Sequence, residues 1–353
     1  MTQRDRYSCQ TRLPGVGVDG QKKLAAASVL VVGAGGLGCP AMQYLAAAGI
    51  GRIGIVDFDA VDLSNLQRQI LYTTADVGKP KAQVAKDTLL KLNPEIKVEA
   101  FAQRLSPENA SSLMAAYDVI LDGTDNFDTK YLINDTAVRL GKPVVFGAVD
   151  GFEGQVSVFG HNSGPCYRCL YPAPPSVAVM ACADNGVLGT VTGIIGAGQA
   201  SEAIKIILGH GSFDTLAGRL WKIDVATMDT SVFQIHRQKN CPVCADGTGR
   251  PAKNASPVCY AGMIEELDAD DLRPTDILID VREQHEWDNG HIPGARHIPL
   301  SLLRQNPDTF APSSGARHVF YCQRGMRSRQ AIEILAGTGH ENIFSLRGGY
   351  DAY

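Results

Sequence analysis

Residues 28–59 constrain the fold of this chain more than any other segment. The aliphatic run Ser28–Val32 is predicted to be a strand, and the glycine-rich Gly33–Gly38 a turn. The alanine-rich stretch 39–48 is predicted to be a helix, and the second aliphatic run, Arg52–Val56, a second strand. A buried strand that leads into a glycine turn, which then opens a helix, forms a cradle for a phosphate group. The sequence therefore predicts a nucleotide site at the end of the first strand.

Each glycine of the turn has a physical role in such a site. Gly33 permits the tight turn, Gly35 lets a ligand approach the backbone, and Gly38 lets the helix pack closely on the sheet. The free N–H groups at the start of the helix then face an anion. Asp57, which follows the second strand, is placed to accept the hydroxyl groups of a ribose. This spacing does not distinguish one nucleotide from another.

Length, charge and hydropathy narrow the class of protein. A chain of 353 residues is expected to form two domains rather than one. A net charge of −4 gives no indication of a nucleic-acid or membrane partner. The longest apolar run, 187–208, is interrupted by Gln199, Glu202 and Lys205, so we expect a buried or interface helix and no membrane span. The polar N-terminal residues predict no signal peptide.

Predicted strands and helices alternate from residue 28 to residue 146. Beyond the first segment, we expect helices at 80–92, after Ser106 and at 128–140, and strands at 96–101, 118–122 and 143–146. Such alternation indicates an α/β fold with a doubly wound, Rossmann-like, mostly parallel sheet. The runs 155–159 and 220–224 are predicted to extend that sheet as antiparallel strands.

A change of composition divides the chain. The segment 249–257 is rich in glycine, proline, alanine and serine, which is typical of a linker. We therefore predict a first domain over residues 1–248 and a second, smaller α/β domain over residues 258–353.

The chain has nine cysteines, four of which form two C-x-x-C pairs. An odd total with clustered pairs favours metal and thiol chemistry in a reducing compartment, so we expect a cytoplasmic protein. Each pair alone could be a redox motif. Two pairs of matching spacing supply four thiolates, however, and favour a closed structural Zn²⁺ site at Cys166, Cys169, Cys241 and Cys244.

Two kinds of nucleotide enzyme compete for the first domain. An NAD-dependent dehydrogenase would need little beyond the glycines and Asp57. Nucleotidyl transfer needs cations for the leaving pyrophosphate and a carboxylate for Mg²⁺. Arg68 and Lys81 follow the second strand and Asp125 follows a later one, and parallel strand ends converge over one crevice. Each cation alone could be a solvated surface charge, but the set favours nucleotidyl transfer.

Five segments together resemble the MoeB/ThiF proteins, the prokaryotic relatives of ubiquitin-activating enzymes. They are Gly33–Cys39, Asp57–Asp59, Leu63–Gln69, Gly78–Lys81 and Asp122–Asn126, and the resemblance runs from about residue 4 to residue 247. It implies ATP in place of NAD, and it assigns to ATP or its Mg²⁺ the residues Gly36, Asp57, Ser64, Asn65, Leu66, Gln67, Arg68, Lys81, Asp125 and Asn126. It also implies a homodimer that adenylates the terminal glycine of a ubiquitin-fold sulfur carrier.

Two cysteines bear on that resemblance. The family commonly has Arg-Tyr-x-Arg-Gln near its N-terminus, and its second arginine reaches ATP in the partner subunit; this chain has Cys9 at that position. A thiol cannot neutralise a phosphate as an arginine does, so adenylation could be slower here, unless Arg12 substitutes. Cys182 could be a small buried residue. The resemblance instead implies that Cys182 forms a covalent link to the carrier.

The second domain presents a cysteine at a strand-to-helix turn. Val319–Tyr321 is predicted to be a strand that runs into Cys322-Gln-Arg-Gly-Met-Arg-Ser328 and then a helix. Backbone N–H groups and the arginines of that loop favour a thiolate or a persulfide anion. A cysteine phosphatase would place an arginine where Ser328 stands, so the loop is too short for phosphate. With Asp280–Glu283 and Gly290–Ala295, it resembles a rhodanese domain.

The whole chain therefore resembles a MoeB-type adenylyltransferase fused to a rhodanese domain. The resemblance implies that ATP activates the carboxylate of a carrier ending in Gly-Gly, and that Cys322 receives a persulfide from an outside donor and passes its sulfur to the carrier. A non-catalytic scaffold that binds a carrier is the alternative, with Cys9 as a sign of decay. The sequence does not reveal which carrier is used.

Overall fold

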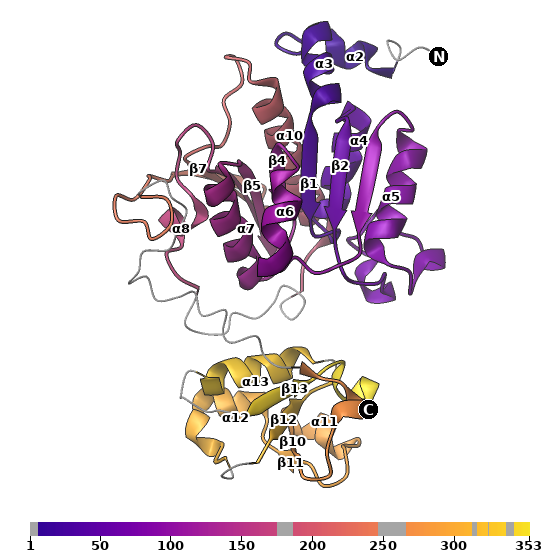
Figure 1. Ribbon diagram of the computed structural model, residues 1–353, viewed down its shortest axis with the longest axis vertical. Helices are drawn as coiled ribbons and strands as arrows, with labels where there is room; N and C mark the ends of the chain where they lie inside the picture. Colours follow the sequence, from indigo (N-terminus) through magenta and orange to yellow (C-terminus); the bar gives the residue numbers. More distant parts are fainter. Residues whose placement is uncertain (1–5, 175–185, 246–265, 313–315, 324, 337–341) are drawn as a thin grey trace. The chain divides into compact units, whose positions relative to one another are not determined.

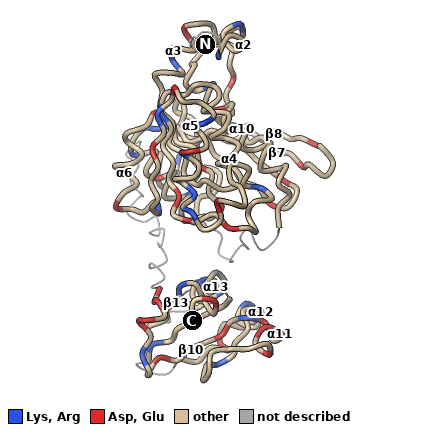
Figure 2. Tube along the Cα trace, turned by 90° about the vertical axis from the view of Figure 1, so that its right-hand side faces the viewer, with Lys and Arg blue, Asp and Glu red and all other residues tan. Residues whose placement is uncertain are grey.

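The computed structural model describes residues 6–174, 186–245, 266–312, 316–323, 325–336 and 342–353. The chain divides into two compact units (Figure 1). The first holds the described residues up to 245, and the second those from 266 onward. Basic and acidic residues are interspersed over both (Figure 2), in keeping with the small net charge. Each unit is described by itself below.

The first unit is built on an eight-stranded sheet with the order β3-β2-β1-β4-β5-β6-β7-β8. Its strands are β1 (Ser28–Val32), β2 (Arg52–Val56), β3 (Lys97–Phe101), β4 (Val119–Asp122), β5 (Val144–Asp150), β6 (Glu153–Phe159), β7 (Arg219–Asp224) and β8 (Asp229–Gln234). The pairs from β3 to β5 are parallel, and those from β5 to β8 are antiparallel. This confirms the predicted parallel sheet with an antiparallel extension. The sequence analysis missed β8.

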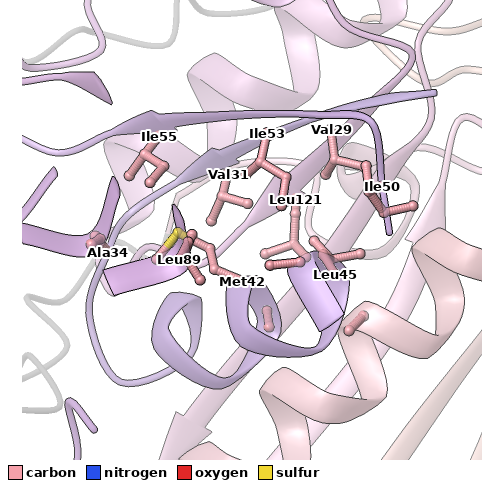
Figure 3. Packing of buried hydrophobic residues seen from close by; sticks show 14 of the residues in the cluster. Val29, Val31, Ala34, Met42, Leu45, Ile50, Ile53, Ile55, Leu89 and Leu121 are labelled. Atoms are coloured by element: carbon pink, nitrogen blue, oxygen red, sulfur yellow. The ribbon is translucent and has the colours of Figure 1, made fainter. Parts of the chain in front are cut away.

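Helices cover both faces of this sheet. They are α2 (Ser8–Thr11), α3 (Gly17–Ala26), α4 (Gly38–Ala48), α5 (Lys81–Leu92), α6 (Pro107–Ala115), α7 (Phe127–Leu140), α8 (Tyr167–Leu170) and α10 (Gly189–Leu208), with short 3₁₀ turns η1 (Leu63–Asn65) and η2 (Thr74–Asp76). One core lies between the sheet and α4, α5 and α10, where Met42 and Leu45 face Val31 and Leu121 (Figure 3). A second core joins α6 and α7 to the other face.

The long apolar helix α10 belongs to the core of this unit. Among the described residues it is the one helix long and apolar enough to cross a membrane. Two of its polar side chains are nevertheless buried and bonded within the fold. Gln199 donates from Nε2 to the carbonyl of Asp122 at 2.7 Å, and Glu202 accepts the N–H of Leu216 at 2.8 Å. The expectation of a buried helix is thus confirmed.

The second unit has a five-stranded parallel sheet with the order β11-β10-β12-β13-β9. Its elements are β9 (Glu266–Leu267), η3 (Ala269–Asp271), β10 (Ile277–Asp280), α11 (Gln284–Asp288), β11 (Arg296–His297), α12 (Leu300–Gln305), η4 (Pro307–Thr309), β12 (His318–Tyr321), α13 (Met326–Ala336), β13 (Ile343–Leu346) and η5 (Gly349–Ala352). One core cluster joins β10 and β12 to α12 and α13, as the predicted small α/β domain requires.

Candidate active sites

The glycine turn of the first unit lies against the loop that follows β4. Gly33 has a φ of 94°, and a Cβ placed on it would lie 2.7 Å from the carbonyl oxygen of Gly123. A Cβ on Gly38 would lie 2.0 Å from the carbonyl oxygen of Gly33, so the helix can start only with glycine there. Because β1 lies between β2 and β4, the chain leaves the sheet in opposite directions at this point. Ligands of doubly wound sheets bind at such a crevice.

Asp57 at the tip of β2 is joined directly to the turn. Its Oδ2 accepts the main-chain N–H of Ala34 at 2.7 Å, and its Oδ1 accepts that of Asp59 at 2.8 Å. Burial raises the pKa of this carboxyl above its ordinary value. Each carboxylate oxygen can accept a further hydrogen bond, so ribose hydroxyls can still bind Asp57.

The loop after β2 packs against the turn and against the start of α10. Within it, Arg68 donates from Nη2 to Oδ1 of Asn65 at 2.6 Å. A Cβ on Gly36 would lie 3.4 Å from Cγ of Arg68, and one on Gly189 would lie 2.4 Å from the carbonyl oxygen of Gln67. The predicted segment Ser64, Asn65, Leu66, Gln67 and Arg68 therefore borders the turn, with Arg68 half-buried.

Lys81 is a buried cation at the start of α5. Its side chain is only 6% exposed, and its Nζ lies 3.0 Å from Oδ2 of Asp59. The possibility that Lys81 is a solvated surface charge is therefore wrong. Since Asp59 is exposed, a second anion could still reach this lysine.

The loop after β4 carries Asp125 and Asn126. Asp125 is exposed. Asn126 accepts the N–H of Thr129 at 2.9 Å and caps the N-terminus of α7, which leaves one lone pair of its Oδ1 and its amide nitrogen to meet a ligand.

The sequence analysis missed a buried ion pair beneath that loop. Nζ of Lys130 lies 3.1 Å from Oδ2 of Asp122 and donates to the carbonyl of Gly147 at 3.0 Å. The other carboxylate oxygen of Asp122 accepts the N–H of Thr124 at 3.0 Å, which fixes the strand tip. No local pattern marks Lys130, because the turn between β4 and α7 brings the two residues together.

The four paired cysteines form one buried cluster. Their Sγ atoms all lie within 4.8 Å of one another. The separations are 3.9 Å for Cys166 and Cys169, 3.5 Å for Cys166 and Cys241, and 3.4 Å for Cys169 and Cys244. A tetrahedral Zn²⁺ with Zn–S bonds of about 2.3 Å separates its sulfurs by roughly 3.8 Å, so this donor set fits Zn²⁺. The hydrogen bond between Cys166 and Cys169 lowers the pKa of Cys169, which favours a thiolate.

This cluster is anchored to α7, the helix that begins beside Asp125. Arg168, between the first two cysteines, makes a buried bidentate pair with Asp135, both bonds being 2.8 Å. Asn134 accepts the N–H of Tyr167 at 2.7 Å. Since the second C-x-x-C pair follows β8, the cluster joins the end of the unit to its middle.

The two remaining predicted cysteines of the first domain differ in what the structure describes. Cys182 lies outside the described residues. Cys9 is exposed on α2, whose neighbour Gln10 donates to the carbonyl of Ala48 at the C-terminal end of α4. This end of α4 lies at the opposite end of the strands from the glycine turn. Within one chain, position 9 is therefore remote from the nucleotide cradle.

Cys322 in the second unit lies directly after β12 and is buried. Its Sγ accepts two main-chain N–H groups, those of Gly325 and Arg327, each at 3.2 Å. Gly325 has a φ of 89°, which favours glycine and lets its N–H turn toward the sulfur. The N-terminus of α13 therefore faces this sulfur, as predicted. Arg324 lies outside the described residues.

The guanidinium of Arg327 also pairs with a carboxylate that the sequence analysis did not identify. Its Nη1 and Nη2 bind the two carboxylate oxygens of Glu286 at 2.5 and 2.6 Å. Hydrogen bonding to Glu286 raises the pKa of Arg327, and the side chain of Cys322 adds to this effect, so the guanidinium interacts with both groups. A second contact from the same side holds the loop, since Arg282 donates to Oε1 of Gln323 at 2.9 Å.

A nucleotide cradle and an amide-lined thiol on two separate sheets define a class of enzyme that couples nucleotide chemistry to sulfur chemistry. The chain belongs to the ThiF family, whose model matches residues 7–243, and a rhodanese-like domain matches residues 261–353. The pairing of these domains is that of an adenylyltransferase and sulfurtransferase, an enzyme that uses ATP.

Similar proteins support this assignment. A probable adenylyltransferase/sulfurtransferase MoeZ of Mycobacterium tuberculosis is 43% identical over 99% of this chain and 92% of its own length. A sulfur carrier protein adenylyltransferase of Thermus thermophilus is 52% identical over 69% of this chain and 91% of its own length. Among solved structures, E. coli MccB with ATP is 25% identical, with a TM-score of 0.57, over 69% of this chain and 74% of that chain.

Proposed function

We propose that this enzyme adenylates the C-terminal glycine of a ubiquitin-fold sulfur carrier ending in Gly-Gly and converts that carboxylate into a thiocarboxylate. The observation that carries the proposal is the gathering of a glycine turn, a ribose acceptor, two cations and a free carboxylate at one edge of the sheet. The names of the M. tuberculosis and T. thermophilus relatives support both the reaction and the carrier. We assign it to a cytoplasmic setting because its cysteines suit a reducing compartment.

In the first step, an oxygen of the carrier carboxylate bonds to the α-phosphorus of ATP, and the bond to pyrophosphate breaks. The amides that follow Gly35 and Gly36 bind phosphate, Gly33 and Gly38 shape the turn, and Asp57 binds ribose. Arg68 and Lys81 stabilise the charge that moves to pyrophosphate. We assign Asp125, with Asn126 beside it, to a Mg²⁺ that would neutralise the triphosphate.

In the second step, the terminal sulfur of a persulfide on Cys322 attacks the acyl adenylate and expels AMP. The product is an acyl disulfide between the carrier and Cys322. A thiol, for which the sequence offers Cys182, then attacks the sulfur of Cys322, forms a disulfide with it and releases the thiocarboxylate. The two amides on Sγ of Cys322 stabilise the thiolate that first takes sulfur from the donor. A persulfide donor outside this chain supplies the sulfur.

Two structural features complete the proposal. Zn²⁺ held by the four paired cysteines would fix the domain's C-terminal end without an open coordination position for catalysis. A homodimer would bring position 9 of the partner to the nucleotide, which α2 of the same chain cannot do. We place the two domains at residues 1–248 and 258–353 and the linker between them at 249–257.

The alternatives predict different measurements. An adenylating enzyme exchanges labelled pyrophosphate into ATP when a Gly-Gly carrier is present, and a scaffold does not.

Cys322→Ala should keep this exchange and lose sulfur transfer to the carrier. Cys182→Ala should also keep exchange and lose any covalent adduct to the carrier. After incubation with a sulfur donor, mass spectrometry should map one added sulfur to Cys322; its appearance on Cys182 alone would contradict the assignment. Tight NADH binding without ATP binding would instead favour a dehydrogenase.

A further inference from the structure

Both polar main-chain groups of Ala34, in the glycine turn, are held by side chains from other parts of the first unit. Its carbonyl oxygen accepts the hydroxyl of Tyr72, which lies on the loop after β2, at 2.7 Å. The thiol of Cys39, a weaker donor on α4, lies 3.5 Å from the same oxygen. The N–H of Ala34 donates to Asp57 at 2.7 Å. Tyr72 and Cys39 are both buried, so the Ala34 carbonyl points into the protein.

The N–H of the next residue, Gly35, belongs to the same peptide group as that carbonyl. In a trans peptide the C=O and the N–H point in opposite directions. Because Tyr72 belongs to the core between the sheet and α4, the N–H of Gly35 points away from that core. It has no acceptor among the residues that the structure describes. A main-chain donor left unpaired at a glycine turn is suited to an anion.

We propose that Tyr72 is a positioning residue for the phosphates of ATP. Its hydroxyl orients the peptide group between Ala34 and Gly35 so that the N–H of Gly35 donates to a phosphate oxygen. This donor adds to the amides that follow Gly35 and Gly36. Tyr72 itself does not touch the nucleotide, because its hydroxyl is bound to the Ala34 carbonyl. The inference rests on the proposed nucleotide site at this turn.

The hydroxyl is needed because glycine allows the peptide group to turn over. Gly35 has no Cβ, so its φ can take either sign at little cost. Without the hydroxyl, the Ala34 carbonyl keeps only the thiol of Cys39, and it gains a better partner by turning toward water in the crevice. A carbonyl oxygen would then face the phosphate where an N–H should be. Burial raises the pKa of Tyr72, so its hydroxyl stays protonated and remains a donor.

Tyr72→Phe tests this on the full chain, because it removes the hydroxyl and keeps the ring in the core. The dissociation constant of ATP, measured by calorimetric titration with Mg²⁺ present, should rise about fivefold, as the loss of one hydrogen bond predicts. A spectroscopic measurement follows the amide itself. In protein labelled with ¹⁵N-glycine, the Gly35 signal is the one missing from Gly35→Ala. ATP should move it downfield in the parent and much less in Tyr72→Phe.

Tyr131→Phe is the matched control. Tyr131 is also a buried tyrosine, and its hydroxyl donates to a main-chain carbonyl, that of Tyr171, at 3.1 Å. This variant should lose a similar amount of thermal stability and keep the ATP dissociation constant of the parent. Equal ATP affinity in Tyr72→Phe and the parent, or an equal loss in both variants, would overturn the inference. A Gly35 signal that does not move when the parent binds ATP would do the same. A parent that binds no ATP would instead refute the proposed nucleotide site.

Discussion

A Cβ placed on Gly35 would have Nε2 of Gln69, 3.7 Å away, as its nearest neighbour. That distance is an ordinary van der Waals contact, so the fold itself has room for a methyl group at Gly35. A neighbouring glycine differs, because a Cβ on Gly38 would lie 2.0 Å from the carbonyl oxygen of Gly33. Glycine at position 38 is therefore required by the fold, whereas glycine at position 35 is required only if a ligand binds there.

Gly35→Ala should leave the melting temperature near that of the parent and weaken ATP binding at least about tenfold, because the methyl group occupies the space that a phosphate needs. Gly38→Ala should lower the melting temperature markedly, since backbone atoms must move. Calorimetric ATP titration and thermal melts of both variants check this. Normal ATP affinity in Gly35→Ala would show that the nucleotide does not approach the turn.

Asp125→Ala should abolish pyrophosphate exchange and leave the fold intact. The side chain is exposed, so its loss removes no core contact, while a carboxylate at this edge of the sheet can hold Mg²⁺ against the triphosphate. Asp128→Ala, another exposed acidic residue close by, is the control and should retain exchange. Exchange at a rate near that of the parent in Asp125→Ala would remove this residue from the mechanism.

Purified protein should contain one Zn²⁺ per chain, held by the four buried cysteines. Cys241→Ser should lose the metal and destabilise the first domain, because structural Zn²⁺ contributes directly to folding. Cys9→Ser makes the same chemical change at an exposed position and should keep both metal and stability. Metal analysis by mass spectrometry with thermal melts gives the answer, and a Zn²⁺-free, fully stable parent would refute the site.

Cys9→Arg should raise the adenylation rate several-fold. A cation at this position of a second subunit would stabilise charge moving to pyrophosphate. Because α2 lies at the far edge of the sheet from its own cradle, the gain should be confined to the dimer and vanish when subunits dissociate on dilution. Cys9→Ala is the control for removal of the thiol. Equal exchange rates for all three proteins would show that the contact is dispensable or that Arg12 supplies it.

The Glu286–Arg327 pair should make the second domain's stability depend on acid pH. Hydrogen bonding from Arg327 lowers the pKa of Glu286 to about 2, against about 4.3 in an unfolded chain. A carboxyl with a lowered folded-state pKa contributes stability above its unfolded-state pKa and loses it as the pH falls through the folded-state value.

Glu286→Gln should therefore reduce the free energy of unfolding by about 1 kcal/mol at pH 7, after allowance for partial solvent screening. The difference from the parent should shrink as the pH falls from about 4 toward 2. Urea unfolding at several pH values measures it. A difference that stays constant across this range would mean that the carboxylate charge contributes nothing.

Periodicity and glycine placement in the sequence were sufficient to predict most of the fold. β1 and β2 begin and end where the pattern placed them, and α6 begins at Pro107 after the predicted cap Ser106. These elements are local, because strand pattern and capping depend on neighbouring residues. β8 was missed because all six of its residues are exposed, so no alternation of buried and exposed positions marks it.

The chemistry of the side chains was determined only in part. The sequence supplies Lys81, Arg327 and the cysteine pairs, and the C-x-x-C spacing correctly predicted one cluster of four thiols. Whether a cation is free depends on partners distant in the chain. Lys81 is buried against Asp59, and Arg327 is paired with Glu286, 41 residues away. No local pattern encodes such a pair.

The sequence by itself thus determined that a glycine cradle, a thiol cluster and a strand-end cysteine exist, since each depends on residues close together. The tertiary structure determined which residues contact the glycine turn, the charged side chains and the strand-end cysteine. It brought Gly33 against Gly123, paired Lys130 with Asp122 beneath the loop of Asp125, and turned two main-chain amides toward Cys322. The physical reason is that ion pairs and close backbone contacts join residues that are far apart in the chain. Only the folded chain brings such residues together.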